Sequence, residues 1–138
     1  MIYLLDTNAC IAIINGRPPL VRERFEAALG LEADMSVSSV VVFELWYGVG
    51  KSRHQARNAD RLQTFLGAPL EILGFDDEDG RIAGLERARL EAAGTPIGPY
   101  DLLIAGQALR HRRTLVTANV GEFSRVRGLA WEDWAAGH

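Results

Sequence analysis

Short apolar runs that each end in a polar residue divide the chain into regular elements. The first run, 2–5, ends at Asp6, and a second apolar run over 9–14 follows it. A short apolar run without alternation is typical of a strand that is buried on both faces, as in a parallel sheet. The residues Asp, Thr and Asn that come next favour a turn and the beginning of a helix. The pattern predicts a strand, then a carboxylate, then a helix.

Elements of the same two kinds alternate along the rest of the chain. The apolar runs predict strands over 2–5, 35–37, 70–73 and 114–117, with a weak one near 129–131. Apolar residues at helical spacing predict helices over 9–14, 21–31, 40–49, 52–66, 76–93 and 100–112. Alternating strands and helices are typical of an α/β fold. We expect a single domain over 1–138, with a mainly parallel central sheet of four to five strands flanked by helices.

Three long stretches of the chain contain one acidic residue each and no other charge. These are Asp6 within 1–15, Glu44 within 35–50 and Asp101 within 92–109. A buried carboxylate without a partner costs several kcal/mol, and none of these stretches offers a Lys or Arg. We therefore expect the three carboxylates to converge and share a cation. Because all the ligands would be oxygen atoms, Mg²⁺ or Mn²⁺ is favoured.

Each acid also has a simpler interpretation, and these differ in strength. Asp6 follows a strand and could only cap the next helix. Asp101 lies three residues after Gly98, where an acid complements the helix dipole. Glu44 is in the middle of a helix among apolar residues, so no capping role accounts for it. Glu122, just after the fourth expected strand with Asn119 nearby, is a further candidate for the same sheet edge.

Composition narrows the class of protein. The chain has 138 residues and a formal charge of −3, which is unremarkable for a globular protein and does not exclude a locally basic surface. Cys10 is the only cysteine, so no intrachain disulfide forms. The sequence shows no secretory leader and no apolar run near the length of a membrane span. We expect a cytoplasmic protein.

Four other possible functional motifs do not have the spacing or the context that their functions require. Residues 48–52 resemble the end of a phosphate-binding loop, but they end a helix instead of beginning one. Residues 76–80 look like a calcium loop, yet the first ligand position is Phe75, so a charged first helical turn is favoured. The three histidines, His54, His111 and His138, are scattered, which argues against zinc and against a Ser-His-Asp triad. Leu45, Trp46 and Tyr47 are more typical of a core than of a nucleobase platform.

Four segments together resemble PIN-domain proteins, and more narrowly the VapC-type toxins of bacterial toxin–antitoxin pairs. They are Leu5-Asp6-Thr7-Asn8, Phe43-Glu44-Leu45-Trp46-Tyr47-Gly48, the stretch from Pro96 to Ala105, and the stretch from Thr117 to Phe123. The ending over 123–134 is also typical of that group. The resemblance implies a PIN-like (Rossmann-like) sheet and Mg²⁺- or Mn²⁺-dependent endoribonuclease activity. It also implies a homodimer and a cognate VapB-like antitoxin.

By position in these motifs, Asp6 and Asp101 would be the principal metal ligands, and Glu44 would complete the acidic cluster. Thr7 and Asn119 would support them. Many PIN domains have an acid at or near the position of Asn119, whereas here the charge is offset to Glu122. That offset leaves open whether a second metal ion binds.

The implied reaction is hydrolysis of RNA phosphodiester bonds by a metal-activated water, with transfer RNA as a substrate typical of the group. Candidate RNA-binding side chains are Lys51, Arg53, Arg57, Arg61, Arg110, Arg112 and Arg113. Apolar residues expected to be exposed for the homodimer and the antitoxin are Phe25, Leu29, Leu62, Phe65 and Leu66. Two alternatives remain: a catalytically silent PIN-like binding protein, and a DNA-directed flap or single-strand nuclease.

Overall fold

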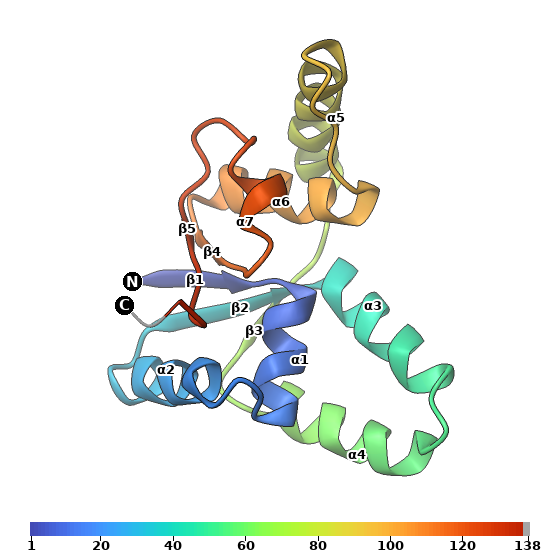
Figure 1. Cartoon of the computed structure of the whole chain (residues 1–138), viewed down its shortest axis with the longest axis vertical. Helices are drawn as coiled ribbons and strands as arrows, with labels where there is room; N and C mark the ends of the chain where they lie inside the picture. Colours follow the sequence, from blue (N-terminus) through green and yellow to red (C-terminus); the bar gives the residue numbers. More distant parts are fainter. Residues whose placement is uncertain (137–138) are drawn as a thin grey trace.

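A computed structural model describes residues 1–136 and shows a single sheet in which all strands are parallel (Figure 1). The strands are β1 (Ile2–Leu5), β2 (Asp34–Ser38), β3 (Glu71–Leu73), β4 (Thr114–Val116) and β5 (Trp131–Glu132). The helices are α1 (Thr7–Asn15), α2 (Pro19–Gly30), α3 (Ser39–Gly50), α4 (Gln55–Leu66), α5 (Asp77–Ala92), α6 (Pro99–His111) and α7 (Val120–Phe123). The expected α/β class and the parallel sheet are confirmed.

The strand order β3-β2-β1-β4-β5 places β1 at the centre of the sheet. The chain builds outward from β1 to β2 and β3, and then crosses back to place β4 on the other side of β1. The strand order therefore reverses between β1 and β4. In open α/β sheets, ligands bind at such a reversal, beyond the carboxyl ends of the strands.

Helices cover the sheet on both sides. In Figure 1, α1, α2 and α4 lie on one side of the sheet, and α6 and α7 lie on the other, with α5 projecting beyond α6. The core between these layers includes the residues of β1 that follow Ile2, together with Val37, Val41, Ile104 and Leu115. Burial of β1 on both faces explains why its sequence is continuously apolar.

Local sequence sets the beginning of three helices. The Ser38 hydroxyl accepts a hydrogen bond from the Val40 N–H and caps α3. Asp76 and Asp79 form a reciprocal capping box at the beginning of α5, so the acidic run over 76–80 is a helical first turn, as expected. Pro99 occupies the first turn of α6, where its missing N–H costs nothing.

Several expectations about the surface are wrong. Phe25, Leu62 and Phe65 were expected to be exposed, but they are buried, and the Phe25 and Phe65 rings lie 5.9 Å apart between α2 and α4. These side chains hold two helices together, so they are not free to bind a partner. Conversely, Tyr47 was expected in the core, yet 62% of it is exposed. The short helix α7 was also not expected.

Within residues 1–136, no helix is both long enough and apolar enough to cross a membrane.

Close packing of α5 on α6 gives a first prediction. A Cβ added to Gly106 would lie 2.7 Å from the Ala83 Cβ and 2.9 Å from its Cα, which is too close for two helix backbones to accept without moving. We expect Gly106→Ala to lower the free energy of unfolding by about 1–3 kcal/mol.

Gly84→Ala on α5 is the matched control, because nothing lies within 4 Å of the Cβ it would add. That substitution should raise stability by roughly 0.5–1 kcal/mol through helix propensity alone. Urea unfolding of the two variants measures both effects. Equal stabilisation by both substitutions would contradict the close approach of the helices.

Candidate active site

The centre of the candidate site is Asp6, at the carboxyl end of β1 and at the point where the strand order reverses. Only 4% of Asp6 is exposed. Its backbone N–H donates to the Val116 carbonyl at 3.1 Å, and its Oδ1 accepts from the Ala9 N–H at 2.7 Å. Asp6 is therefore the N-cap of α1. The capping interpretation is correct for this residue, and it does not compete with a role in a site, because one carboxyl oxygen remains outside that bond.

Glu44 reaches the same region from α3. Its side chain is half-buried, and its Oε1 accepts a hydrogen bond of 2.7 Å from the Thr7 hydroxyl at the beginning of α1. This bond joins α1 to α3 through two residues that are 37 positions apart in the chain. Thr7 thus orients Glu44.

Asp101 in the first turn of α6 and Glu122 in α7 are joined by one amide. The Asn119 Nδ2 donates to Glu122 Oε2 at 2.8 Å and to Asp101 Oδ2 at 3.3 Å. Glu122 Oε1 also accepts from the Gly98 N–H at 3.3 Å, directly before α6. Asn119 and Glu122 therefore fix the loop that positions Asp101.

The charges of these acids disfavour one another. Burial raises the pKa of Asp6, hydrogen bonds from Thr117 and from the Ala9 N–H oppose this, and the Glu44 charge raises it further. Burial, the neighbouring Glu122 carboxyl, and the charges of Asp6 and Glu44 raise the pKa of Asp101 to about 7. The four acids thus lie close enough to repel.

The pKa of Glu122 is lowered, first by its hydrogen bond with Asp101. The two carboxyl groups form a coupled pair, in which the pKa of Asp101 is raised and that of Glu122 is lowered. Among residues 1–136, the ion pairs do not include Asp6, Glu44, Asp101 or Glu122. The repulsion is therefore not relieved by a lysine or arginine in contact.

The chemistry of the donors fits a hard divalent cation, because every available ligand atom is a carboxylate, hydroxyl or amide oxygen. A cation would also relieve the repulsion between Asp6 and Asp101. However, within the described part of the chain, no three His, Cys, Asp or Glu side chains are arranged to enclose a metal ion as they stand. The acidic cluster therefore has the ligand types of a metal site, but its side chains are not arranged as a preformed metal-binding cage.

The histidines lie away from the acids or outside the described residues. His54 precedes α4, and His111 is 3.5 Å from Asp79 at the opposite end of α6 from Asp101. Ten residues of helix separate His111 from Asp101, which is about 15 Å. His138 lies outside the described residues.

Two of the candidate RNA-binding arginines serve the fold instead. Arg110 pairs with Asp76 and with Asp79, which is fully buried. Arg113 donates to the Ser36 hydroxyl at 3.0 Å and lies 3.6 Å from Glu71. The expectation that they bind RNA is not supported.

Among the other candidates, Arg61 donates to the Ile14 carbonyl and to Asn15 Oδ1, so it too is engaged within the fold. Lys51, Arg53, Arg57 and Arg112 are exposed. The first three of these follow α3 or begin α4.

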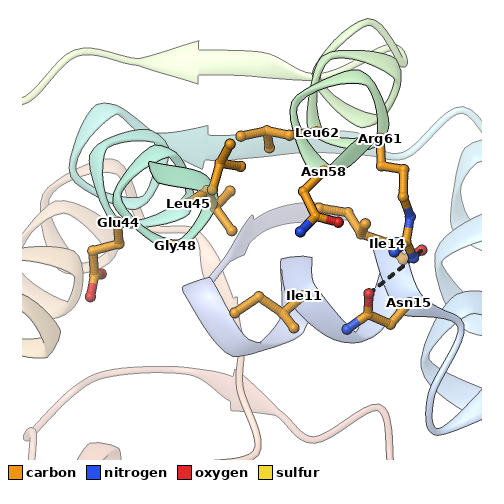
Figure 2. A pocket seen from close by; sticks show the side chains of 10 residues that line it. Ile11, Ile14, Asn15, Glu44, Leu45, Gly48, Asn58, Arg61 and Leu62 are labelled. Atoms are coloured by element: carbon orange, nitrogen blue, oxygen red, sulfur yellow. Dashed lines mark hydrogen bonds between the residues drawn. The ribbon is translucent and has the colours of Figure 1, made fainter. Parts of the chain in front are cut away.

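An apolar pocket of about 200 Å³ borders the acids between α1, α3 and α4 (Figure 2). It is lined by Ile11, Ile14, Asn15, Glu44, Leu45, Gly48, Val49, Asn58, Arg61 and Leu62. In Figure 2, Glu44 lies at one end of this pocket, apart from the apolar side chains. The pocket is thus a neighbour of the acidic cluster, not its centre.

The sequence placed Thr117 near the same sheet edge as Asn119 and Glu122 without giving it a role, and it assigned no site role to Gly98. The Thr117 side chain is buried, hydrogen-bonds Asp6, and accepts from the Asn119 N–H at 2.9 Å. A Cβ on Gly98 would lie 3.4 Å from Asp101 Oδ2. The signal for Thr117 was present, because it directly follows β4 as Asp6 follows β1. Nothing in the sequence indicates that the Gly98 N–H contacts Glu122.

Comparison with known proteins shows which family the sequence is similar to. A family model described as the PIN domain matches residues 3–129. A tRNA(fMet)-specific endonuclease VapC from Salmonella typhimurium is 40% identical over 132 residues, covering 96% of this chain and 97% of that protein. Ribonuclease VapC2 from Rickettsia felis is 41% identical over 134 residues, covering 97% of this chain and 98% of that protein.

Solved structures show the same fold. The crystal structure of VapBC2 from Rickettsia felis, bound to a DNA fragment from its promoter, contains a chain with a TM-score of 0.88 and 39% identity. That match covers 96% of this chain and 98% of the other. A chain of DNA-bound VapBC from Salmonella typhimurium also has a TM-score of 0.88, with 40% identity over 97% of this chain and 98% of the other.

The raised pKa of Asp101 predicts how the metal-free protein responds to pH. The folded state binds this proton more tightly than the unfolded chain does, so stability is lost as pH rises from about 4 through 7. Asp101→Asn removes this loss. In the presence of a chelator, we expect the variant to exceed the wild type at pH 8 by about 1–2 kcal/mol, after discounting for solvent at a half-buried group.

Thermal unfolding of both proteins from pH 4 to pH 8 measures this difference. Asp60→Asn, at an exposed position on α4, is the control and should change stability by the same small amount at every pH. A wild-type curve that stays parallel to the Asp101→Asn curve would show that the acids do not repel one another in the folded state.

Proposed function

The chain belongs to the PIN-domain family, and on this premise we propose that it is the endoribonuclease toxin of a toxin–antitoxin pair. The observation that carries the proposal is the group of four acids at the strand reversal, none of which forms an ion pair with a lysine or arginine among residues 1–136. Full-length relatives named as VapC ribonucleases support the reaction class. The toxin acts by cutting RNA needed for translation, and a VapB-like antitoxin neutralises it.

Asp6 and Asp101 are the residues we propose to hold Mg²⁺ or Mn²⁺, with Glu44 completing the acidic cluster. The chemistry that such an ion supplies is activation of a water and neutralisation of charge on a phosphate. Thr7 holds the Glu44 carboxylate by its hydroxyl, and Asn119 holds Asp101 by its amide. These hydrogen bonds from Thr7 and Asn119 fix the carboxylates in place and so determine where a phosphodiester is attacked.

Glu122 fits a positioning role better than a direct one. Both of its oxygens already accept hydrogen bonds, one from the Gly98 N–H and one from Asn119. Arg125, whose charge also lowers the pKa of Glu122, donates to the Pro96 carbonyl at 2.7 Å. Together they hold the loop over 96–98 on which the position of Asp101 depends.

The substrate we propose is RNA, with transfer RNA as the first candidate, because the relative from Salmonella typhimurium is named for tRNA(fMet). Two alternatives make different predictions. A catalytically silent PIN-like partner would not need all four acids in one region, and a DNA-directed nuclease would cut DNA under the same conditions. Incubating the protein with labelled total RNA and with DNA, with Mg²⁺ or with a chelator, distinguishes the three.

Asp101→Asn also separates catalysis from helix capping. The substitution keeps the shape of the side chain but removes a charge and a ligand. We expect RNA cleavage to fall by more than about 100-fold. The rise in melting temperature caused by Mg²⁺ should also shrink, because that rise reports the affinity of the folded state for the ion.

Asp77→Asn is the matched control, since Asp77 is an exposed acid in the first turn of α5. The free energy of unfolding of this variant should fall by only about 0.3–1 kcal/mol, because a favourable interaction with the helix dipole is lost. RNA cleavage and the rise in melting temperature caused by Mg²⁺ should both be unchanged. If Asp101→Asn still cuts RNA and responds to Mg²⁺ as the wild type does, Asp101 is only a helix-terminal acid.

A further proposal concerns assembly. We expect the chain to form a homodimer, as the family resemblance implies, and to bind a VapB-like antitoxin, as the VapBC complexes of Rickettsia felis and Salmonella typhimurium suggest. Expression of the chain alone should arrest growth of the host, and co-expression of its antitoxin should restore growth. Light scattering at micromolar concentration measures the assembly state, and a monomer would contradict the homodimer.

A further inference from the structure

Two aromatic rings join the helices that carry Glu44 and Asp101. Phe43 directly precedes Glu44 on α3, and Tyr100 directly precedes Asp101 on α6. The centroids of the two rings lie 5.7 Å apart at an interplanar angle of 54°, which is within the range of attractive aromatic pairs. The contact between α3 and α6 therefore lies one residue away from a site acid on each helix. We call Phe43 and Tyr100 the aromatic pair.

The aromatic pair is not part of the core. Phe43 is 53% exposed and Tyr100 is 46% exposed. The core holds α3 through Val41 and Leu45 and holds α6 through residues such as Leu102, so neither ring is needed to anchor its own helix. The aromatic pair thus adds a contact between the two helices at the surface, beside the acids.

The acids on these two helices repel each other. The charge of Glu44 is one of the causes that raise the pKa of Asp101. Thr7 holds Glu44 from α1, and Asn119 holds Asp101 from the residues before α7, so each acid is tied to a different element. Among residues 1–136, no hydrogen bond and no ion pair joins α3 to α6. Apolar contacts must therefore hold α3 against α6.

We propose that Phe43 and Tyr100 are positioning residues, whose ring contact keeps α3 and α6 close enough for Glu44 and Asp101 to reach the same divalent cation. The proposal rests on the proposed function, because it concerns the ion that these acids are proposed to hold. The side chains do not enclose an ion as they stand. The aromatic pair therefore sets the separation of the two helix backbones, and rotation of the carboxylates completes the site.

The energetic reason for such a contact is preorganisation. Without the aromatic pair, repulsion between the acids would favour arrangements in which α3 and α6 are further apart. A cation would then use part of its binding energy to bring the helices together, and its apparent affinity would fall. With the aromatic pair in place, the helices already have the required separation before the ion binds.

Tyr47 shows how an aromatic residue on the same face of α3 differs. It follows Phe43 by four residues, so the two side chains lie on one face of the helix, and it is 62% exposed. The Lys51 Nζ, at the end of the same helix, lies 4.8 Å from the centre of its ring. Among residues 1–136, Tyr47 forms no ring pair with α6. Tyr47 is therefore the matched control for Phe43.

The first test measures the affinity for Mg²⁺ without RNA, from the rise in melting temperature as Mg²⁺ is added. We expect Phe43→Ala and Tyr100→Ala each to weaken Mg²⁺ binding about 2- to 10-fold, which is the fold-change that corresponds to the loss of one aromatic pair. Phe43→Tyr and Tyr100→Phe keep both rings and should bind Mg²⁺ as the wild type does. Tyr47→Ala should also match the wild type.

A double-mutant cycle tests the ring contact itself. If the two rings act through each other, the variant with both Phe43→Ala and Tyr100→Ala should bind Mg²⁺ no more weakly than either single variant. If the rings act independently, the two fold-changes multiply. Phe43→Leu removes the ring but keeps an apolar side chain, and it replaces Phe43→Ala in the cycle if that variant does not fold.

Cleavage distinguishes positioning of the acids from contact with the substrate. At low Mg²⁺ concentration, Phe43→Ala and Tyr100→Ala should cut RNA more slowly than the wild type. At saturating Mg²⁺, kcat and the KM for RNA should both return to within about twofold of the wild type. A ring that contacted the substrate would instead raise KM at every Mg²⁺ concentration.

If the wild type cuts no RNA, the proposed function fails, while a loss of Mg²⁺ affinity that does not multiply in the double variant would still support the aromatic pair. The role of the pair is overturned if the single variants bind Mg²⁺ as the wild type does, if their fold-changes multiply, or if Tyr47→Ala weakens binding equally. A wild type whose melting temperature does not respond to Mg²⁺ or Mn²⁺ also overturns it. So does a change only in the oligomeric state measured by light scattering.

Discussion

The structure depends on holding several carboxylates together in one small region without a cationic side chain in contact. Asp6 is almost fully buried, and Asp101 carries a pKa raised to about 7 by burial and by its acidic neighbours. Hydrogen-bond donors partly offset this cost: the Ala9 N–H for Asp6 and the Asn119 amide for Asp101. Asp6 and Asp101 also lie at the N-terminal ends of α1 and α6, where the helix dipoles favour negative charge. The fold therefore tolerates the cluster, and a divalent cation would stabilise it.

Sheet topology explains why acids so distant in sequence meet. Asp6 extends the central strand, and the reversal of strand order between β1 and β4 leaves space above its carboxyl end. Glu44 and Asp101 come from helices on opposite sides of that reversal, and α3 and α6 are in contact there. Thr7 and Asn119 then lock the carboxylates to neighbouring elements. Stability and chemistry are thus coupled, because Asp6 and Asp101, which lie at the beginning of α1 and α6, are also the residues that would bind the ion.

The sequence predicted the sheet well, and it singled out four acids that the fold brings into one region, because both features leave local signals. A strand buried on both faces must be continuously apolar, and an acid within a long uncharged stretch is conspicuous. The side of a helix that meets the core leaves no such signal. Helical spacing shows that Phe25 and Leu29 share a face, yet only the packing of α2 on α4 shows that Phe25 is buried. The pairing of Arg110 with Asp76 joins residues 34 apart, so counting local charges could not reveal it.

Hydrolysis and recognition are carried by different parts of the same surface. A cation held by carboxylates acts on any phosphodiester that reaches it, so the acids alone cannot choose a substrate. Selection must come from groups that contact the RNA outside the cluster. Most of the arginines near α6 are committed to the fold or lie at its far end, whereas Lys51, Arg53 and Arg57, which follow α3 or begin α4, are exposed. Contacts with a polyanion must therefore come from residues outside the acids, because the acids themselves repel it.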